Sequence, residues 1–345
     1  MALDILWVDS FDSYGSGALA DLTTEAYSTA NASSASFGAG VTGNAVSLVT
    51  NTDTAIQLDK TLSSAQSRLK VHVRWSYSSV VSTRKVVAFY SSGTLQAYVE
   101  ITSSNTIRVK NGVGTQLATA SVTLAGNTFY HLEIDITFNS STGAFDVYHE
   151  GTLVMTATGV NTTNGGGNQA NIVSFGSSAG TGSSVTFKLD DLIIQSGSGD
   201  FPLGQLQVHY SVPTAAGNSN ANSDEAGAGN SSNYQSVDES PSNGDTDYIK
   251  LETSGNIDLY TMGDLTPTSG TIKAVVVKSQ AKLNVPGAKT YRHKVRTNST
   301  NYNGSAIAPT TSYADYITPW YTNPNTSVSW TIAEVNALEA GFEAI

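Results

Sequence analysis

The chain of 345 residues contains no cysteine. This absence excludes disulfide bonds and thiolate metal sites, and disulfides are what small secreted domains usually depend on. Domains of about 100–200 residues bury enough apolar surface to fold without such cross-links. The length therefore predicts two domains, each stabilised by a packed core.

Charge is also scarce, and basic charge most of all. Charged residues make up 13% of the chain, with 17 Lys and Arg against 28 Asp and Glu, which gives a net charge of −11. Such a surface repels polyanions, so we expect no nucleic acid as a partner. Aliphatic runs such as residues 274–277 (AVVV) are far shorter than the roughly 20 residues that span a bilayer. We therefore expect no membrane insertion.

Ser, Thr, Asn and 31 Gly take the place of the missing charge. These residues disfavour helices and suit short strands joined by turns. Strict alternation of apolar and polar side chains marks four strands in the first half, at residues 69–75 (LKVHVRW), 96–101 (QAYVEI), 106–110 (TIRVK) and 131–137 (HLEIDIT). Alternation places one face of a strand on a core and the other toward solvent or a ligand. We predict an all-β fold that begins with an antiparallel jelly-roll sandwich.

The second half of the chain has a different residue pattern. Residues 195–200 (QSGSGD) and Pro202 predict a linker, so we divide the chain into residues 1–198 and 199–345. A strand is expected at 205–212, then a long loop at 214–235. Further strands are expected at 248–251, 257–260, 272–278 and 291–297.

A short helix is predicted near the C-terminus. Thr331 and Glu334 form a capping box, Trp330 and Val335 occupy the positions of a hydrophobic staple, and Gly341 is a natural stop. The second domain is thus expected to be β-rich and to end in a short α-helix.

Several stretches of the first domain resemble the concanavalin A-like and laminin G-like jelly rolls of phage structural proteins. They are residues 7–12 (WVDSFD), 43–48 (GNAVSL), 129–134 (FYHLEI), 145–151 (FDVYHEG) and 189–194 (LDDLII). Residues 233–239, 245–248 and 329–342 resemble a domain of tailed-phage virion proteins. In such jelly rolls the first and last strands lie side by side.

The resemblance implies a non-enzymatic virion protein on the particle exterior, as a tail-fibre accessory or capsid decoration. Residues 1–11 lack the features of a signal peptide, although the composition is that of an extracellular protein. Assembly in the host cytoplasm and release by lysis would reconcile the two. The expected partners are other virion proteins, further copies of this chain and a host-surface glycan. A free lectin or adhesin is the alternative.

Glycan binding is expected on the outward positions of the predicted strands. The candidate residues are Lys70, His72, Arg74, Tyr98, Glu100, Glu133 and Asp135. Sugars are bound by bidentate polar groups and an aromatic platform, for which Tyr98 is the candidate. A solvated sheet face explains the same pattern.

A β-glucan hydrolase is the enzymatic alternative. Laminarinase-like relatives of this jelly roll carry Glu-x-Asp-x-x-Glu on one strand, and Glu133 and Asp135 fit its start. Phe138 stands where the last Glu belongs. Because the third acid is missing, we expect no catalytic residues. The Gly176 to Gly180 segment matches G-x-S-x-G, but no helix pattern follows it, so we expect a turn.

Metal sites are weakly indicated. Asp9 and Asp12 would lie near Asp190 and Asp191 where the first and last strands meet, which makes Ca²⁺ the candidate ion. Asp in turns more often accepts hydrogen bonds from its own backbone, so no cofactor is the main expectation. The five histidines show no zinc-ligand spacing.

Four aromatic residues lie close together in the sequence of the second domain. Tyr313, Tyr316, Trp320 and Tyr321 form either an interface patch or core packing beneath the C-terminal helix.

Overall fold

The computed structural model describes residues 4–14, 22, 26–30, 35–50, 57–79, 83–165, 167–176, 185–197, 199–225, 232–284, 287 and 289–345. It divides into two compact units, Met1–Val208 (unit 1) and His209–Ile345 (unit 2). The boundary therefore falls at 208/209 rather than at the predicted 198/199.

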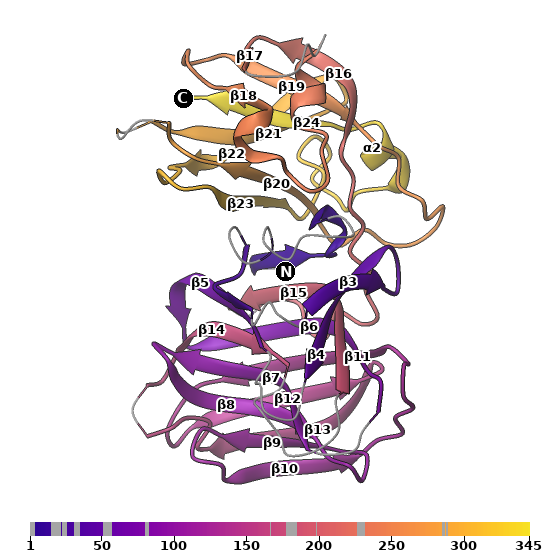
Figure 1. The fold of residues 1–345 in the computed structure, drawn as a ribbon, viewed down its shortest axis with the longest axis vertical. Helices are drawn as coiled ribbons and strands as arrows, with labels where there is room; N and C mark the ends of the chain where they lie inside the picture. Colours follow the sequence, from indigo (N-terminus) through magenta and orange to yellow (C-terminus); the bar gives the residue numbers. More distant parts are fainter. Residues whose placement is uncertain are drawn as a thin grey trace. The chain divides into compact units, whose positions relative to one another are not determined.

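Unit 1 is an antiparallel jelly-roll sandwich of two sheets, drawn in indigo to magenta in Figure 1. Among the described residues, sheet A has eight strands in the order β13-β12-β11-β6-β15-β4-β3, with β1 paired to β15. Their bounds are β1 Asp4–Asp9, β3 Ala35–Ala39, β4 Asn44–Thr50, β6 Arg68–Tyr77, β11 Tyr130–Thr137, β12 Gly143–His149, β13 Thr152–Val160 and β15 Val185–Ser196. The first and last strands of the unit thus lie side by side, as predicted.

Sheet B has seven strands within the described ranges, in the order β10-β9-β8-β7-β14-β5-β2. Their bounds are β2 Thr29–Ala30, β5 Leu58–Gln66, β7 Arg84–Ser91, β8 Thr94–Ile101, β9 Thr106–Asn111, β10 Gln116–Ser121 and β14 Ala170–Phe175. A 3-10 turn at Asp12–Tyr14 follows β1.

The core of unit 1 lies between the two sheets. Alternate residues of β6 (Leu69, Val71, Val73 and Trp75) are at most 1% exposed, and those of β11 follow the same rule. The intervening side chains lie on the opposite side of sheet A, which we call the outer face of sheet A. The predicted alternation of β6 and β11 is therefore confirmed.

Residues 205–212 form no strand, contrary to expectation, and the strand β16 (Pro213–Asn220) begins one residue before the predicted loop and occupies its first part. The physical reason is that the 199–208 segment uses its backbone to contact the outer face of sheet A. Leu203 N and Gly204 N donate to Glu133 Oε1, and Val208 N donates to Asp191 Oδ1. These amides are therefore not available for a strand ladder.

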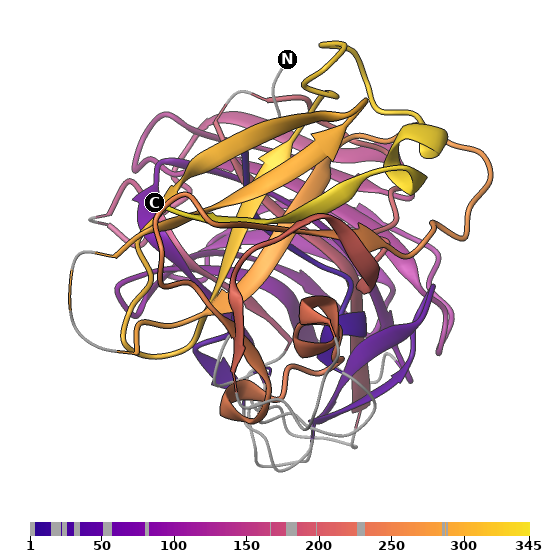
Figure 2. The same ribbon diagram turned by 90° about the horizontal axis from the view of Figure 1, so that it is seen from above.

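Unit 2 is β-rich, as predicted, and Figure 2 shows its long orange and yellow strands side by side. Within its described residues, a five-stranded sheet has the order β16-β19-β24-β21-β22, and β17-β18 and β20-β23 form two-stranded sheets. The remaining bounds are β17 Ser223–Glu225, β18 Tyr248–Lys250, β19 Ile257–Met262, β20 Val275–Ala281, β21 Tyr291–Thr297, β22 Thr300–Ile307, β23 Ala314–Trp320 and β24 Glu339–Ala344. Short 3-10 helices lie at Asn233–Ser236 and Gly244–Thr246.

The predicted helix near the C-terminus is α2, Ile332–Asn336, and its capping box between Thr331 and Glu334 is confirmed. It does not continue to Gly341, because β24 follows it and pairs with both β19 and β21. A Cβ at Gly341 would lie 2.0 Å from the Asp258 carbonyl oxygen, so Gly341 permits a close approach of strands rather than ending a helix.

Candidate active site

The outer face of sheet A gathers ionisable side chains from three neighbouring strands. Strand pairing places Glu133 opposite His72 on β6, and Asp135 opposite Lys70. On the other side of β11, Asp135 lies opposite Asp146 of β12. Directly opposed residues have Cβ atoms about 4.5–5.5 Å apart, so these groups interact across the strands.

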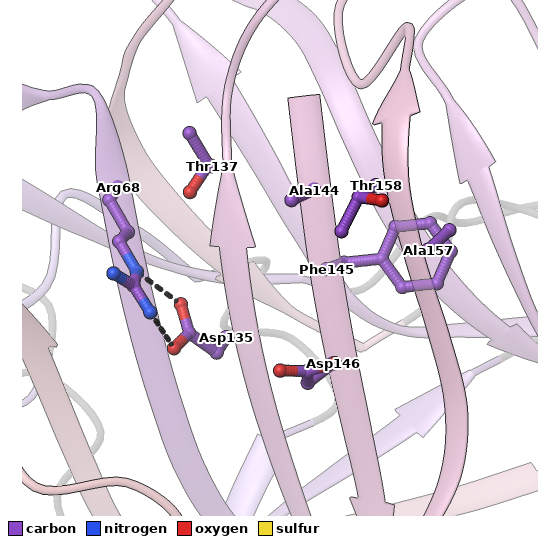
Figure 3. Close-up of a pocket in the computed structure, with 8 residues that line it drawn as sticks. All are labelled: Arg68, Asp135, Thr137, Ala144, Phe145, Asp146, Ala157 and Thr158. Carbon is purple, nitrogen blue, oxygen red and sulfur yellow. Dashed lines mark hydrogen bonds and ion pairs between the residues drawn. The ribbon is translucent and has the colours of Figure 1, made fainter. Parts of the chain in front are cut away.

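A cavity of about 60 Å³ opens on this face, lined in part by Arg68, Asp135 and Asp146. Figure 3 shows Arg68 hydrogen-bonded to Asp135, and the carboxylate of Asp146 points toward Asp135. Arg68 Nε and Nη2 donate to the two carboxylate oxygens over 2.8 and 2.6 Å. The hydrogen bond to Asp135 raises the pKa of Arg68. No ion pair is found for Asp146 in the described part of the chain.

Beside this cavity, His72, His131 and Glu133 form a buried cluster, each with a side chain at most 2% exposed. His72 Nδ1 and His131 Nε2 lie 2.8 Å apart, within hydrogen-bonding distance. Burial lowers the pKa of both histidines to about 3, with a smaller contribution from the positive charge of Arg74. Burial also raises the pKa of Glu133, which the amides of Leu203 and Gly204 partly offset.

The 199–208 segment covers this buried cluster. Besides the bonds to Glu133 and Asp191, Lys70 Nζ donates to the Gly199 carbonyl over 2.5 Å. The Phe201 ring packs edge-on against Tyr148 and lies 5.7 Å from Lys70 Nζ. Burial accordingly lowers the pKa of Lys70. The segment leaves the cavity between Arg68, Asp135 and Asp146 open.

Five of the seven predicted glycan-face residues lie together on this face: Lys70, His72, Arg74, Glu133 and Asp135. Tyr98 and Glu100 do not, because β8 belongs to sheet B. There Glu100 forms ion pairs with Arg108 at 2.9 Å and Lys110 at 3.0 Å, and Lys85 Nζ lies 4.9 Å from the Tyr98 ring centre. The predicted platform therefore divides between two faces of the sandwich.

The predicted Ca²⁺ group is also divided. Asp9 accepts hydrogen bonds from Phe11 N, Tyr14 OH and Tyr27 OH, as a buried structural residue does. Asp12 and Asp190 instead contact the 41–44 turn, through Asn44 N and Val41 N.

Two members of that group titrate unusually. Burial and the neighbouring Asp191 raise the pKa of Asp190 to about 7. Burial raises the pKa of Asp191 to about 6.

No protein-family model matches the chain, and no curated protein matches it. Solved structures with a similar fold include an alginate lyase (12% identity, TM-score 0.42, 61% of this chain and 100% of that one). A glycoside hydrolase family 131 catalytic domain from Coprinopsis cinerea has 14% identity and a TM-score of 0.40 over 58% of this chain and 98% of that one. A carbohydrate esterase of bacteriophage phi24B has 14% identity and a TM-score of 0.39 over 57% and 100%.

The jelly-roll fold rests on the sheet topology of unit 1, and these comparisons say nothing of the activity of this chain. The prediction of a non-enzymatic virion structural protein finds no support among them, because the three solved structures are named as carbohydrate-processing enzymes.

Sequence reasoning missed Arg68 and Asp146. The expected pattern placed a third acid on the same strand, at the position of Phe138. The Phe138 side chain lies in the core and is 1% exposed. The third carboxylate comes from the neighbouring strand. The alternation of residues 145–149 and the Ser141-Thr142-Gly143 turn were the signal, because a hairpin closed there pairs Asp146 with Asp135.

The remaining candidates lie elsewhere. Trp320 packs with Trp330 in a buried cluster of unit 2. Tyr313 OH donates to Asp245, and Tyr316 packs edge-on against Tyr291. Tyr321 is half-buried.

Residues 177–180 of the G-x-S-x-G match lie outside the described residues. Within the described residues, no helix is long and apolar enough to cross a membrane.

Proposed function

We propose that the chain hydrolyses glycosidic bonds of a polysaccharide at the cavity between Asp135 and Asp146. The observation that carries this proposal is the pairing of two carboxylates across β11 and β12 at an opening on the outer face of sheet A. Glycosidases use two such acids, one on each side of the scissile bond.

The direct pairing of Asp135 with Asp146 permits a mechanism that retains configuration. Carboxyl groups of retaining glycosidases lie about 5–5.5 Å apart, while inverting enzymes need roughly 6.5–9.5 Å to admit a water molecule. The Cβ atoms of directly opposed strand residues are about 4.5–5.5 Å apart. The pairing of Asp135 with Asp146 therefore permits the shorter spacing, and the configuration of the first product tests it.

The surroundings assign a role to each carboxylate. Arg68 fixes Asp135 with two hydrogen bonds, which suits a nucleophile held in one orientation. In the first step Asp135 forms a bond to the anomeric carbon while Asp146 protonates the departing glycosidic oxygen. In the second step Asp146 takes a proton from water, whose oxygen bonds to the anomeric carbon and releases Asp135 as carboxylate.

A neutral polysaccharide such as a β-glucan fits better than an acidic one. The net charge is −11, and two carboxylates flank the opening against one guanidinium. Uronic acids would be repelled by this arrangement. The cavity is well below the roughly 300–1,000 Å³ of enclosed ligand pockets, so a long chain lying across the surface fits better than a small molecule.

The test is turnover of a β-glucan panel by the full chain, with alginate as the acidic comparison. We expect reducing ends from a neutral glucan, with the β-anomer as first product by NMR. Asp146→Asn should lower kcat/KM by about 10²–10⁴-fold, and Asp135→Asn at least as much. Glu100→Gln, on sheet B, is the control and should keep full activity. Unchanged turnover in both Asp variants would reject the assignment, and binding without any turnover would reject hydrolysis.

The location on a phage particle stays a prediction, with other virion proteins, further copies of this chain and a host-surface glycan as the predicted partners. A polysaccharide hydrolase is compatible with that location, where it would cut surface glycans of the host. Mass spectrometry of purified particles tests it.

A further inference from the structure

The cluster of His72, His131 and Glu133 leaves three buried polar atoms without a hydrogen-bond partner. They are His72 Nε2, His131 Nδ1 and Glu133 Oε2. More than about 90% of buried polar groups in proteins have a partner, and each exception calls for an explanation, such as a bound water or ion. The three side chains are exposed by 2%, 0% and 0%, so bulk water does not reach them.

While Glu133 is ionised, no choice of histidine tautomers removes the deficit. A neutral imidazole has one N–H, and the two rings already share one hydrogen bond between His72 Nδ1 and His131 Nε2. If His131 donates it, the lone pair of His131 Nδ1 faces Glu133 Oε2, 4.0 Å away. If His72 donates it, His72 Nε2 keeps a lone pair without a donor. A buried acceptor is left over either way.

We propose that these three residues bind a divalent transition-metal ion, with Zn²⁺ as the best match. Each residue offers one ligand atom, and the three atoms lie within 4.8 Å of one another. Two imidazoles and one carboxylate are a known ligand set for zinc. A cation bound to His72 Nδ1, His131 Nε2 and Glu133 Oε1 leaves each imidazole with its N–H on the unpartnered nitrogen. There His131 Nδ1 faces Glu133 Oε2, and His72 Nε2 donates toward the Leu206 carbonyl.

The geometry needs only a small adjustment. Nitrogens bound 2.0–2.1 Å from a tetrahedral zinc ion lie roughly 3.3 Å apart, whereas His72 Nδ1 and His131 Nε2 are 2.8 Å apart. Separation by about half an ångström turns the shared hydrogen bond into two metal bonds. The His72 Nδ1 to Glu133 Oε1 distance of 3.8 Å already suits two ligands of one ion.

The site is independent of the proposed hydrolysis. It joins β6 to β11, and through Glu133 Oε1 it also holds the amides of Leu203 and Gly204. A metal here would fix the 199–208 segment on sheet A and stabilise unit 1. Metal content and unfolding temperature are therefore the readouts, and polysaccharide turnover is not one.

The test uses the full chain, stripped with a chelator and titrated with Zn²⁺ alone. We expect one ion per chain by inductively coupled plasma mass spectrometry after dialysis. At a free Zn²⁺ concentration 100-fold above Kd, the unfolding temperature of unit 1 should rise by roughly 5–10 °C. Co²⁺ in place of Zn²⁺ should give the visible absorption of a low-coordinate His site.

Variants assign the ligands. Glu133→Gln and His131→Gln should each lose the bound ion and the rise in unfolding temperature. His209→Gln, a half-buried histidine outside the cluster, is the control and should keep both. A folded wild-type chain that holds no ion and shows no Zn²⁺-dependent shift would overturn the proposal in favour of a closed imidazole–imidazole hydrogen bond. Ion binding that survives both ligand variants would overturn it as well.

Discussion

Asp190 of β15 is fully buried and is a member of no ion pair in the described part of the chain. Its oxygens accept hydrogen bonds from the amides of Val41 and Asp191. Those bonds do not offset burial and the neighbouring charge of Asp191, so the pKa of Asp190 rises to about 7. Asp135 differs from Asp190, because Arg68 donates a hydrogen bond to each of its carboxylate oxygens.

This difference predicts the pH dependence of stability. Between about pH 4 and pH 7, folded Asp190 holds a proton that unfolded Asp190 has lost, so the free energy of unfolding falls as the pH rises through this range. Asp190→Asn removes this loss of stability, because the amide does not titrate. The wild type should lose on the order of 4 kcal/mol relative to this variant between pH 4 and pH 8.

Urea unfolding at pH 4, 6 and 8 measures the effect. Asp4→Asn, which changes an exposed carboxylate of β1, is the control and should follow the wild type. A constant difference between wild type and Asp190→Asn across this range would show that Asp190 has the same pKa in the folded and unfolded chains.

At the scale of single strands, the sequence predicts well which side chains of a strand face the core. It predicts poorly which strands pair with one another. The alternation in β6 and β11 places His72 and Glu133 on the face away from the core. A shift of one residue would turn these ionisable side chains into the core between the sheets and turn Val and Ile out of it. The alternation cannot tell that β8 belongs to the other sheet, since Tyr98 alternates in the same way. Nor can the spacing of His72 and His131 indicate a ligand pair, because only strand pairing brings them together.

The 199–208 segment shows the same limit for irregular elements. Its Gly and Pro residues are typical of a linker, and nothing local indicates that Glu133 and Asp191 accept its amides. The register of β11 and β15 decides those contacts, and both strands are distant in sequence. A segment without a strand pattern can therefore be an integral part of a sandwich.

Leu203 is the anchor of this segment, with 8% of its surface exposed. Leu203→Ala should lower the free energy of unfolding of unit 1 by about 2–3 kcal/mol, since it removes buried apolar surface and leaves a void. Leu153→Ala is the matched control: it lies on β13 of the same unit, is 46% exposed, and should cost less than about 0.5 kcal/mol. Equal effects in chemical denaturation would show that the segment does not pack on sheet A in solution.

At the scale of the whole molecule, each unit has a core of its own. Unit 1 buries the inner faces of sheets A and B. In unit 2 the buried cluster consists of Val295, Trp320, Trp330 and Leu338, next to the capped helix α2. Units with separate cores are expected to unfold as separate cooperative transitions.

Trp330→Ala tests that separation. The indole is 3% exposed and its Nε1 donates to the Trp320 carbonyl over 3.0 Å, so its removal should cost unit 2 about 3–5 kcal/mol. In hydrogen exchange followed by mass spectrometry, we expect faster exchange in β19, β21 and β24, with β6 and β11 unchanged. An equal loss of protection in β6 and β11 would mean that both units unfold in one step, because the destabilisation of one core would then be shared by the whole chain.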